Sequence, residues 1–353
     1  MSKKKEKTGG LKRFFIFLFT LLLLVTGAFA WWIAFRNNVN VGTDDKVYLY
    51  IPKNTNYNQL LEIIKQDKII SDINSFDWYA KRMKLNQQII PGKYRIIKGM
   101  DNRQIVKMLK NGKEEKITLT INYTTRSINQ LKEKLCTRFN ISEEEMEMFL
   151  ANEELINRKY GLGTQSVSCL IRPGKYELSW ALETEDIFDL MYEKYSSIWT
   201  SERLKKSKKI NLSQAEIITL ASIVDCESKI ESEQKKIAGV YLNRLEKNMA
   251  LQADPTVIFA IGNFNIQRLS FEDLKIDSPY NTYKYKGLPP GPVSFPTEKA
   301  IESVLNYEKN NYLFFCAKPE LNGYSNFSAT FEEHLKYADA YRKALDKRGI
   351  NRN

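Results

Sequence analysis

The sequence predicts an α+β protein that a single N-terminal transmembrane helix holds at a membrane. An uncharged apolar run fills residues 14–35, strand-like and helical patterns then alternate along the chain, and long loops rich in Pro, Gly and Asn follow in the C-terminal half. The length of 353 residues suffices for an anchor and at least two domains. Hydrophobic (43%) and charged (27%) fractions are those of a globular chain, which argues against disorder.

The N-terminal segment has the composition of a membrane span. Its basic flank consists of Lys3, Lys4, Lys5, Lys7, Lys12 and Arg13. Phe14–Phe35 follows without a charge, and about 20 apolar residues cross the hydrocarbon core of a bilayer. The basic flank predicts a cytoplasmic N-terminus, so everything after Arg36 is expected on the outer side. Trp31 and Trp32 suit the outer interface.

A cleaved signal peptide is the alternative for this segment. Ala28-Phe29-Ala30 matches an A-x-A cleavage site. The apolar run, however, is longer than the roughly 7–15 residues of a signal-peptide core, and it continues to Phe35. We therefore expect a retained anchor.

Charge and cysteine content limit the classes of partner. The net charge of +12 fits nucleic acid, a membrane surface or an acidic polymer. The lysines are scattered without a basic arm or helix, so no nucleic acid partner is expected. The cysteines, which are Cys136, Cys169, Cys226 and Cys316, lack metal-site spacing and the chain has one His, so we expect no metal and no cofactor. One or two disulfides and buried free thiols are equally compatible with this pattern.

An internal repeat predicts two small α+β units. The pattern of an alternating strand, capping residues and an apolar-periodic helix begins at Val47 and again at Ile117. Pro-Gly-Lys-Tyr occurs at residues 91–94 and recurs at 173–176. Each unit is expected to run strand, helices, turn and strand, helix.

The C-terminal half predicts helices that hold polar loops. Ser213 is the expected N-cap of the helix in "SQAEIITLASIVDCE". A second helix carries an apolar stripe of Ile237, Val240, Tyr241 and Leu245. Loops at 251–258 and 277–296 are dense in turn formers and aromatic residues. Loops on rigid helices are typical of a loop-built binding groove.

One acid, Glu227, lies on an apolar helical stripe. Its neighbours one and two turns earlier are Leu220, Ile223 and Val224. Desolvation at such a position raises the pKa of a carboxyl, which can then stay protonated near neutrality and act as a general acid. Asp225 is about 200° further round the helix, so it cannot pair with Glu227 and is expected to face solvent or cap a neighbouring element. Alternatively, the helix ends near Glu227 and its carboxyl meets water or a lysine.

The downstream loops supply side chains suited to a sugar. The candidate substrate-binding residues are Gln252, Asp254, Tyr280, Asn281, Thr282 and Tyr283. Most glycosidases use two carboxylates. Candidate second acids, none fixed by spacing, are Asp254, Asp273, Asp277, Glu332 and Glu333. A one-carboxyl route is also open, in which the acid protonates the leaving oxygen and then accepts a proton from a hydroxyl of the same sugar, which closes onto the anomeric carbon.

The segments together resemble the YceG-like family of membrane-anchored endolytic murein transglycosylases. The most specific are "LASIVDCES", "IAGVYLNRL", "LQADPTVIFA", "DSPYNTYKYKGLPPGPVSFP" and "TFEEH". The resemblance implies that Glu227 is the catalytic acid and base, and that Glu333 and His334 belong to the site. The chain departs from the family pattern at Asp225, where a Glu is usual, and at Ser325 and Ala329, where His and Lys are common.

The resemblance also implies an activity, partners and a location. The expected reaction is internal cleavage of peptidoglycan strands between MurNAc and GlcNAc with 1,6-anhydro-MurNAc ends, which would end the growth of nascent strands. Peptidoglycan synthases (penicillin-binding proteins) are the expected partners, and the bacterial inner (cytoplasmic) membrane is the expected location. The alternatives are a non-catalytic cell-wall scaffold and a two-carboxylate hydrolase of the same polymer.

The expected domain organisation combines these inferences. It comprises a basic cytoplasmic tail (1–13), a transmembrane anchor (14–36), a polar linker (37–45), a LysM-like module (46–116) and a catalytic domain (117–348), the last divided into a second α+β unit (117–210) and a catalytic core (211–348).

Overall fold

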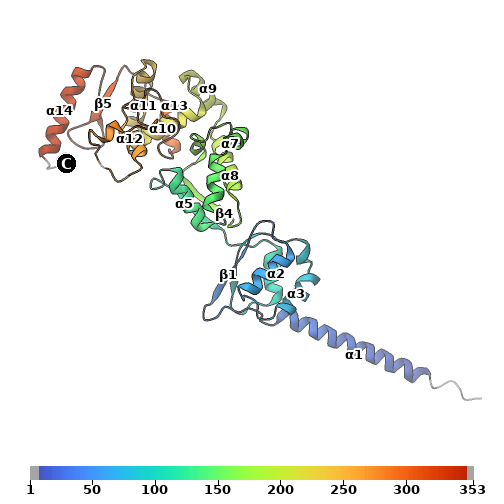
Figure 1. Ribbon diagram of the computed structural model, residues 1–353. Helices are drawn as coiled ribbons and strands as arrows, with labels where there is room; N and C mark the ends of the chain where they lie inside the picture. Colours follow the sequence, from blue (N-terminus) through green and yellow to red (C-terminus); the bar gives the residue numbers. More distant parts are fainter. Residues whose placement is uncertain (1–7, 267, 348–353) are drawn as a thin grey trace, which may run out of the picture. The chain divides into compact units, whose positions relative to one another are not determined.

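The computed structural model describes residues 8–266 and 268–347 (Figure 1). The chain folds into two compact units. Unit 1 comprises residues up to 118 together with 138–140 and 177–183, and unit 2 comprises the remainder. Helices and small two-stranded sheets make up both units, which confirms the predicted α+β class.

The predicted N-terminal apolar helix is present as α1 (Thr8–Phe35). Its segment Gly10–Phe35, 26 residues, is long and apolar enough to cross a membrane. At 1.5 Å per residue this segment is about 39 Å long, against roughly 30 Å of hydrocarbon. The side chains of most of this segment are exposed in the structure, which is the state expected of a helix that meets lipid.

Unit 1 is built on an antiparallel pair of strands. The elements in chain order are β1 (Lys46–Ile51), α2 (Tyr57–Gln66), α3 (Ile73–Arg82), η1 (Leu85–Gln87), β2 (Gly92–Ile97) and α4 (Asn102–Lys110). β1 pairs with β2 from Lys46 opposite Ile97 to Ile51 opposite Gly92. Alternate strand residues enter the core, where the helices supply the remaining apolar side chains. Capping boxes at Asn56 and Asp101 fix the starts of α2 and α4.

The segment predicted as a linker is part of unit 1. Asn37 and Val39 form isolated bridges with Asp101 and Ile70. Asn38 is fully buried, and its side chain donates to Asn102 Oδ1 and accepts from the N–H of Asp72. Residues 37–39 therefore continue the fold directly from α1, and the linker prediction is wrong for them.

The predicted second α+β unit follows in the same order of elements. It contains β3 (Ile117–Ile121), α5 (Ile128–Arg138), α6 (Glu143–Ala151), α7 (Glu153–Tyr160), η2 (Val167–Leu170), β4 (Gly174–Leu178) and α8 (Thr184–Ser197). β3 and β4 form a two-stranded sheet, as β1 and β2 do.

The repeated tetrapeptide has the same local structure in both copies. Tyr94 donates its hydroxyl to the carbonyl of Ile90 over 2.8 Å, and Tyr176 donates to the carbonyl of Arg172 over 2.6 Å. Both rings are buried. The glycine of each copy has a positive φ, 146° and 157°. A residue without a Cβ is favoured there, which explains the recurrence of Gly before Lys and Tyr.

The C-terminal part of unit 2 is a helical core with one small sheet. Its elements are α9 (Ser201–Ile210), α10 (Gln214–Glu227), α11 (Glu231–Glu246), α12 (Asp254–Ile261), η3 (Asp273–Lys275), α13 (Glu298–Leu305), β5 (Phe314–Ala317), β6 (Ser325–Ser328) and α14 (Phe331–Lys347). α10, α11 and α13 pack against one another (Figure 1). β5 and β6 are antiparallel, and α14 packs against both. α10 is the central element of this core, since its residues 217–225 are all buried.

Candidate active site

Helix α10 places the predicted catalytic acid at its C-terminal end. Ser213 caps the helix as predicted, in a capping box with Glu216, and Glu227 is the last helical residue. Leu220, Ile223 and Val224 are fully buried, which confirms the apolar surroundings inferred from periodicity. Glu227 itself is half-buried, so its carboxyl lies at the border between the core and solvent.

The carboxyl of Glu227 is held by a tyrosine of the next helix. The hydroxyl of Tyr241, on α11, donates to Glu227 Oε1 over 2.8 Å. Tyr241 is 1% exposed, and its ring meets the Phe315 ring edge-on at 5.8 Å. Burial raises the pKa of Glu227 to about 7, the Tyr241 hydrogen bond lowers it, and the charge of Asp254 raises it. A carboxyl with such a pKa exists in both protonation states near neutrality, as an acid and base must.

A second acid–tyrosine pair, Asp254 and Tyr283, accompanies the first. The Tyr283 hydroxyl donates to Asp254 Oδ1 over 2.5 Å. Asp254 is the first residue of α12, where the helix dipole favours a carboxylate. Burial and the bond to Asp254 raise the pKa of Tyr283, so its hydroxyl remains a donor. Because the Asp254 charge acts on Glu227, the two pairs belong to one electrostatic site.

Asp254 is the candidate second acid that the structure brings to Glu227. The other candidates are engaged elsewhere: Asp273 accepts from Ser270, Asp277 from Lys284 and Tyr285, Glu332 pairs with Lys336, and Glu333 accepts from Tyr337.

Gln252 is held by Arg244, a buried arginine that is not among the predicted site residues. Arg244 is 7% exposed and donates to the carbonyls of Leu313 (2.6 Å) and Leu251 (2.8 Å). Its Nη1 also lies 3.3 Å from the amide oxygen of Gln252. Gln252 has a left-handed backbone with φ +53° and an exposed side chain. A non-glycine residue in this conformation is strained, and such strain is concentrated at functional sites.

Asn281 and Thr282 are buried residues whose side-chain hydrogen bonds hold the loop at 277–296 in its conformation. Asn281 is 0% exposed and donates to the carbonyls of Leu274 and Ile276. Thr282 is 1% exposed and its hydroxyl lies 2.8 Å from that of Thr256. Direct contact of these two side chains with a substrate, as the sequence predicts, does not fit this burial, because their polar atoms are already bonded within the loop.

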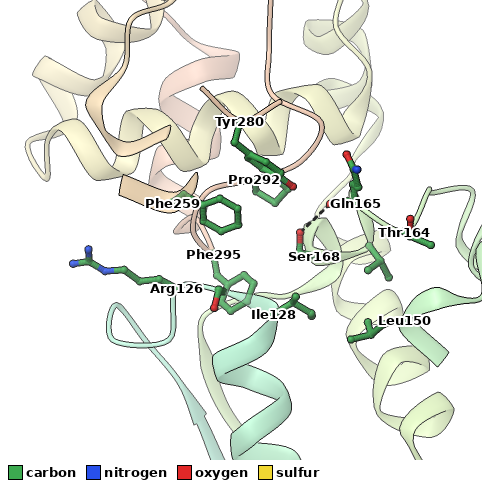
Figure 2. Close-up of a pocket in the computed structure, with 12 residues that line it drawn as sticks. Arg126, Ile128, Leu150, Thr164, Gln165, Ser168, Phe259, Tyr280, Pro292 and Phe295 are labelled. Carbon is green, nitrogen blue, oxygen red and sulfur yellow. Dashed lines mark hydrogen bonds between the residues drawn. The ribbon is translucent and has the colours of Figure 1, made fainter. Parts of the chain in front are cut away.

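Tyr280 lines a small apolar pocket (Figure 2). Its ring lies 4.6 Å from that of Phe259, and Figure 2 shows both beside Pro292, opposite Ser168 and Ile128. The pocket holds about 120 Å³. Its lining residues are Arg126, Ser127, Ile128, Leu150, Thr164, Gln165, Val167, Ser168, Phe259, Tyr280, Pro292 and Phe295. Glu227 is not among these lining residues.

His334 and Glu333 lie at the start of α14. The His334 ring stacks on the Phe314 ring, with 5.3 Å between their centroids. The Arg244 guanidinium lies 5.2 Å from the centroid of the Phe314 ring. Burial and the charge of Arg244 lower the pKa of His334. Its Nδ1 is buried without a hydrogen-bond partner among the residues described. Glu333 accepts from Tyr337 within its own helix.

Asp225 has a structural position. It is 4% exposed and accepts from Gln234 Nε2 and from the backbone N–H of Thr297, both over 3.1 Å. It also pairs with Lys229 at 3.2 Å. The expectation of a solvent-facing side chain is wrong, whereas the alternative, capping, is confirmed, because Thr297 is the N-cap of α13.

The sequence does not predict Tyr241 or Arg244 as site residues. It predicts the Tyr241 ring on an apolar stripe, and the ring is buried accordingly, but the pattern does not indicate that the hydroxyl bonds to Glu227. One feature of the sequence does point to its role: Tyr241 brings a hydroxyl to a stripe whose other members, Ile237, Val240 and Leu245, are aliphatic. All four cysteines, whose state the sequence left open, are free thiols.

Comparison with known proteins places this chain in a family. The YceG-like family matches residues 49–340. An endolytic murein transglycosylase of Bacillus subtilis is 30% identical over 336 residues, which cover 90% of this chain and 91% of that protein. A protein of the same name from Streptococcus pneumoniae is 29% identical, and the match covers 85% of this chain and 60% of the relative's length.

A solved structure agrees with the sequence comparison. The 2.6 Å crystal structure of a yceG-like protein from Listeria monocytogenes has a TM-score of 0.53 and 27% identity. The match covers 83% of this chain and 98% of that one. Family match, relatives and fold together confirm the predicted resemblance: the chain belongs to the YceG-like family.

Proposed function

We propose that this protein is a lytic transglycosylase that cuts peptidoglycan glycan strands between MurNAc and GlcNAc and leaves 1,6-anhydro-MurNAc ends. The observation that carries the proposal is the half-buried Glu227. Its carboxyl has a pKa raised to about 7, and one of its oxygens accepts a hydrogen bond from Tyr241. The names of the relatives from Bacillus subtilis and Streptococcus pneumoniae support peptidoglycan as the substrate class.

The first step is general acid catalysis by Glu227. Because Oε1 accepts the Tyr241 hydrogen bond, the acidic proton is carried by Oε2. Oε2 donates this proton to the glycosidic oxygen while the bond between that oxygen and C1 of MurNAc breaks. The leaving sugar departs with a hydroxyl, and C1 acquires oxocarbenium-like positive charge.

The second step reverses the role of Glu227. Its carboxylate accepts the proton of the MurNAc C6 hydroxyl as O6 bonds to C1, which closes the 1,6-anhydro ring. The carboxyl ends protonated, as it began, and no water is consumed. One group can serve as acid and then as base because a pKa near 7 makes both forms accessible at neutral pH.

Tyr241 and Asp254 support Glu227 in different ways. Tyr241 is a positioning residue that fixes which carboxyl oxygen carries the proton. Asp254, held by Tyr283, supplies a negative charge that raises the pKa of Glu227 and stabilises positive charge at C1. Gln252, Tyr280, Glu333 and His334 remain the proposed substrate-binding residues.

A two-carboxylate hydrolase is the second candidate. The observation in its favour is the electrostatic coupling of Asp254 to Glu227, since Asp254 is then available to activate a water. A scaffold without activity is the third reading, but it offers no reason for a partly buried acid with a raised pKa at a helix end.

The products decide between the candidates. The full chain in detergent is incubated with purified peptidoglycan, and the released fragments are analysed by mass spectrometry. Transglycosylation gives anhydro ends that are about 18 Da lighter than reducing ends, a difference of one water. Reducing ends would establish the hydrolase instead, and unchanged glycan strands in the presence of folded protein would leave the scaffold reading.

The proposed setting follows from α1. We propose that α1 spans the cytoplasmic membrane once, with the basic tail inside and unit 2 outside, where nascent strands are made. Cleavage there would end strand growth beside penicillin-binding synthases. Protease digestion of intact spheroplasts tests the orientation, because only an outward unit 2 is degraded.

A further inference from the structure

The last turn of α1 is built into unit 1. Ile33 and Ala34 belong to the apolar run, yet they are 4% and 6% exposed. Asn102, the first residue of α4, donates its side-chain amide to the carbonyl of Ile33 over 2.9 Å. Asn38 donates in turn to Asn102 Oδ1 over 2.7 Å, and its own oxygen accepts from the N–H of Asp72. Helix and unit are therefore one continuous structure at this junction.

The junction fixes the depth of unit 1 at the membrane, provided that α1 spans it as proposed. About 20 residues of helix cross the hydrocarbon core, and the twentieth residue from Phe14 is Ile33. Side chains of unit 1 that touch residues 33–35 consequently lie at the level of the lipid headgroups. Unit 1 cannot move away from this level without breaking the buried hydrogen bonds of Asn38 and Asn102.

Two arginines occupy this level, and they differ in how they are paired. The Arg36 guanidinium lies 4.0 Å from the Trp32 ring, and Arg36 is bonded to Asp72 and Ser75. The Arg103 guanidinium lies 4.7 Å from the ring of Phe35, the last residue of α1. Its carboxylate partner is Asp101 at 3.6 Å, a loose contact, and its side chain is 47% exposed.

We propose that Arg103 binds the phosphate of an anionic phospholipid in the outer leaflet. A guanidinium presents two parallel N–H groups to a phosphate, and the loose contact with Asp101 leaves such a fork accessible. A basic side chain next to a transmembrane helix is attracted by anionic headgroups within about 10 Å of the surface. Phe35 beneath the guanidinium keeps it at the boundary between headgroup and hydrocarbon.

Arg95 provides a matched control in the same unit. It lies on β2, is 55% exposed, and has a similarly loose carboxylate contact, with Glu115 at 3.8 Å. Among the residues that the structure describes, its charged partner is Glu115 on the strand side of the unit, whereas Arg103 contacts Phe35 of α1. Arg103→Ala and Arg95→Ala remove the same charge and the same number of side-chain atoms, so they differ in position alone.

The test measures lipid retention by the full chain. Each variant is purified from nanodiscs of equal phosphatidylglycerol and phosphatidylcholine, and the phosphatidylglycerol that stays bound on stepwise delipidation is counted by native mass spectrometry. We expect Arg103→Ala to retain several-fold less than the wild type, Arg95→Ala to retain as much, and Arg103→Lys to fall between. Equal retention by Arg103→Ala and wild type, or an equal loss in Arg95→Ala, overturns the proposal.

Two further arms separate this result from other effects. Nanodiscs of phosphatidylcholine alone show whether the headgroup charge matters, and equal retention of both lipids by the wild type contradicts the proposal. Thermal unfolding is compared across variants to show that Arg103→Ala remains folded, as expected for an exposed side chain. Glycan cleavage is not a readout, so failure here leaves the proposed function untouched.

Discussion

The hydroxyl of Tyr241 and Oε1 of Glu227 are 2.8 Å apart, and this hydrogen bond joins two helices at the site. Glu227 ends α10, whereas Tyr241 lies inside α11. The bond leaves one carboxyl oxygen for proton transfer. The consequences for activity, pH dependence and stability are separable by single substitutions.

Replacing Glu227 with Gln should abolish cleavage and keep the fold. Gln has the same shape and still accepts the Tyr241 hydrogen bond, but it has no proton to transfer. Positioned acids and bases contribute about 10²–10⁴-fold in rate, so we expect a loss of at least 100-fold in released fragments. Circular dichroism and thermal unfolding verify the fold. Near-normal cleavage by the variant would remove Glu227 from the mechanism.

The same substitution should stabilise the protein at alkaline pH. A carboxyl whose pKa is raised from 4.5 to about 7 contributes stability as the neutral form below pH 4.5, and that stability is lost as the pH rises through about 7. Gln stays neutral throughout. Because part of Glu227 meets solvent, we expect a gain of roughly 1–2 kcal/mol at pH 8 and none at pH 4, measured by urea unfolding. A gain that is equal at both pH values would contradict the raised pKa.

Tyr241→Phe should shift the pH profile of cleavage upward. The lost hydrogen bond favoured the carboxylate, so the pKa of Glu227 rises further and the alkaline limb of the profile moves to higher pH. The rate at the optimum should fall about 10-fold, because the carboxyl is less well oriented. A purely structural role of Tyr241 would lower stability and leave the limb in place, so kinetics are recorded across pH 5–9 below the unfolding temperature.

Asp254→Asn should shift the same limb in the opposite direction. Removing the negative charge lowers the pKa of Glu227, so less of the acid is protonated at neutral pH. Asp277→Asn is the control, since Asp277 is bonded to Lys284 and Tyr285 and does not act on Glu227. A downward shift in both variants would indicate a general charge effect. Complete loss of cleavage with Asp254→Asn, together with reducing ends in the wild type, would favour the hydrolase.

Truncation within α1 should be tolerated only before its last turn. A chain that begins at Trp31 keeps the burial of Ile33 and the bond from Asn102 to its carbonyl. A chain that begins at Arg36 loses both, which should cost unit 1 about 2–4 kcal/mol, the sum of one buried aliphatic side chain and one hydrogen bond. Urea unfolding of the two fragments measures the difference. Equal stabilities would show that the junction contributes nothing to the fold.

The sequence alone determined the features that depend on one segment of chain. The apolar run predicted α1, the capping residues predicted the start of α10, and the period of 3.6 residues placed Glu227 among Leu220, Ile223 and Val224. The repeated tetrapeptide predicted two units with one order of elements. Each of these follows from local periodicity, capping or composition, which a linear sequence records directly.

Tertiary structure decided which side chains meet. Periodicity identifies the buried face of a helix, but it does not say which residue of another helix lies opposite, since that depends on how the helices pack. For this reason the sequence separated Asp225 from Glu227 but did not pair Glu227 with Tyr241. Packing also buried Asn281, which the sequence predicted to bind substrate. The sequence predicted Glu227 as the acid, and helix packing decided that Tyr241 is its partner.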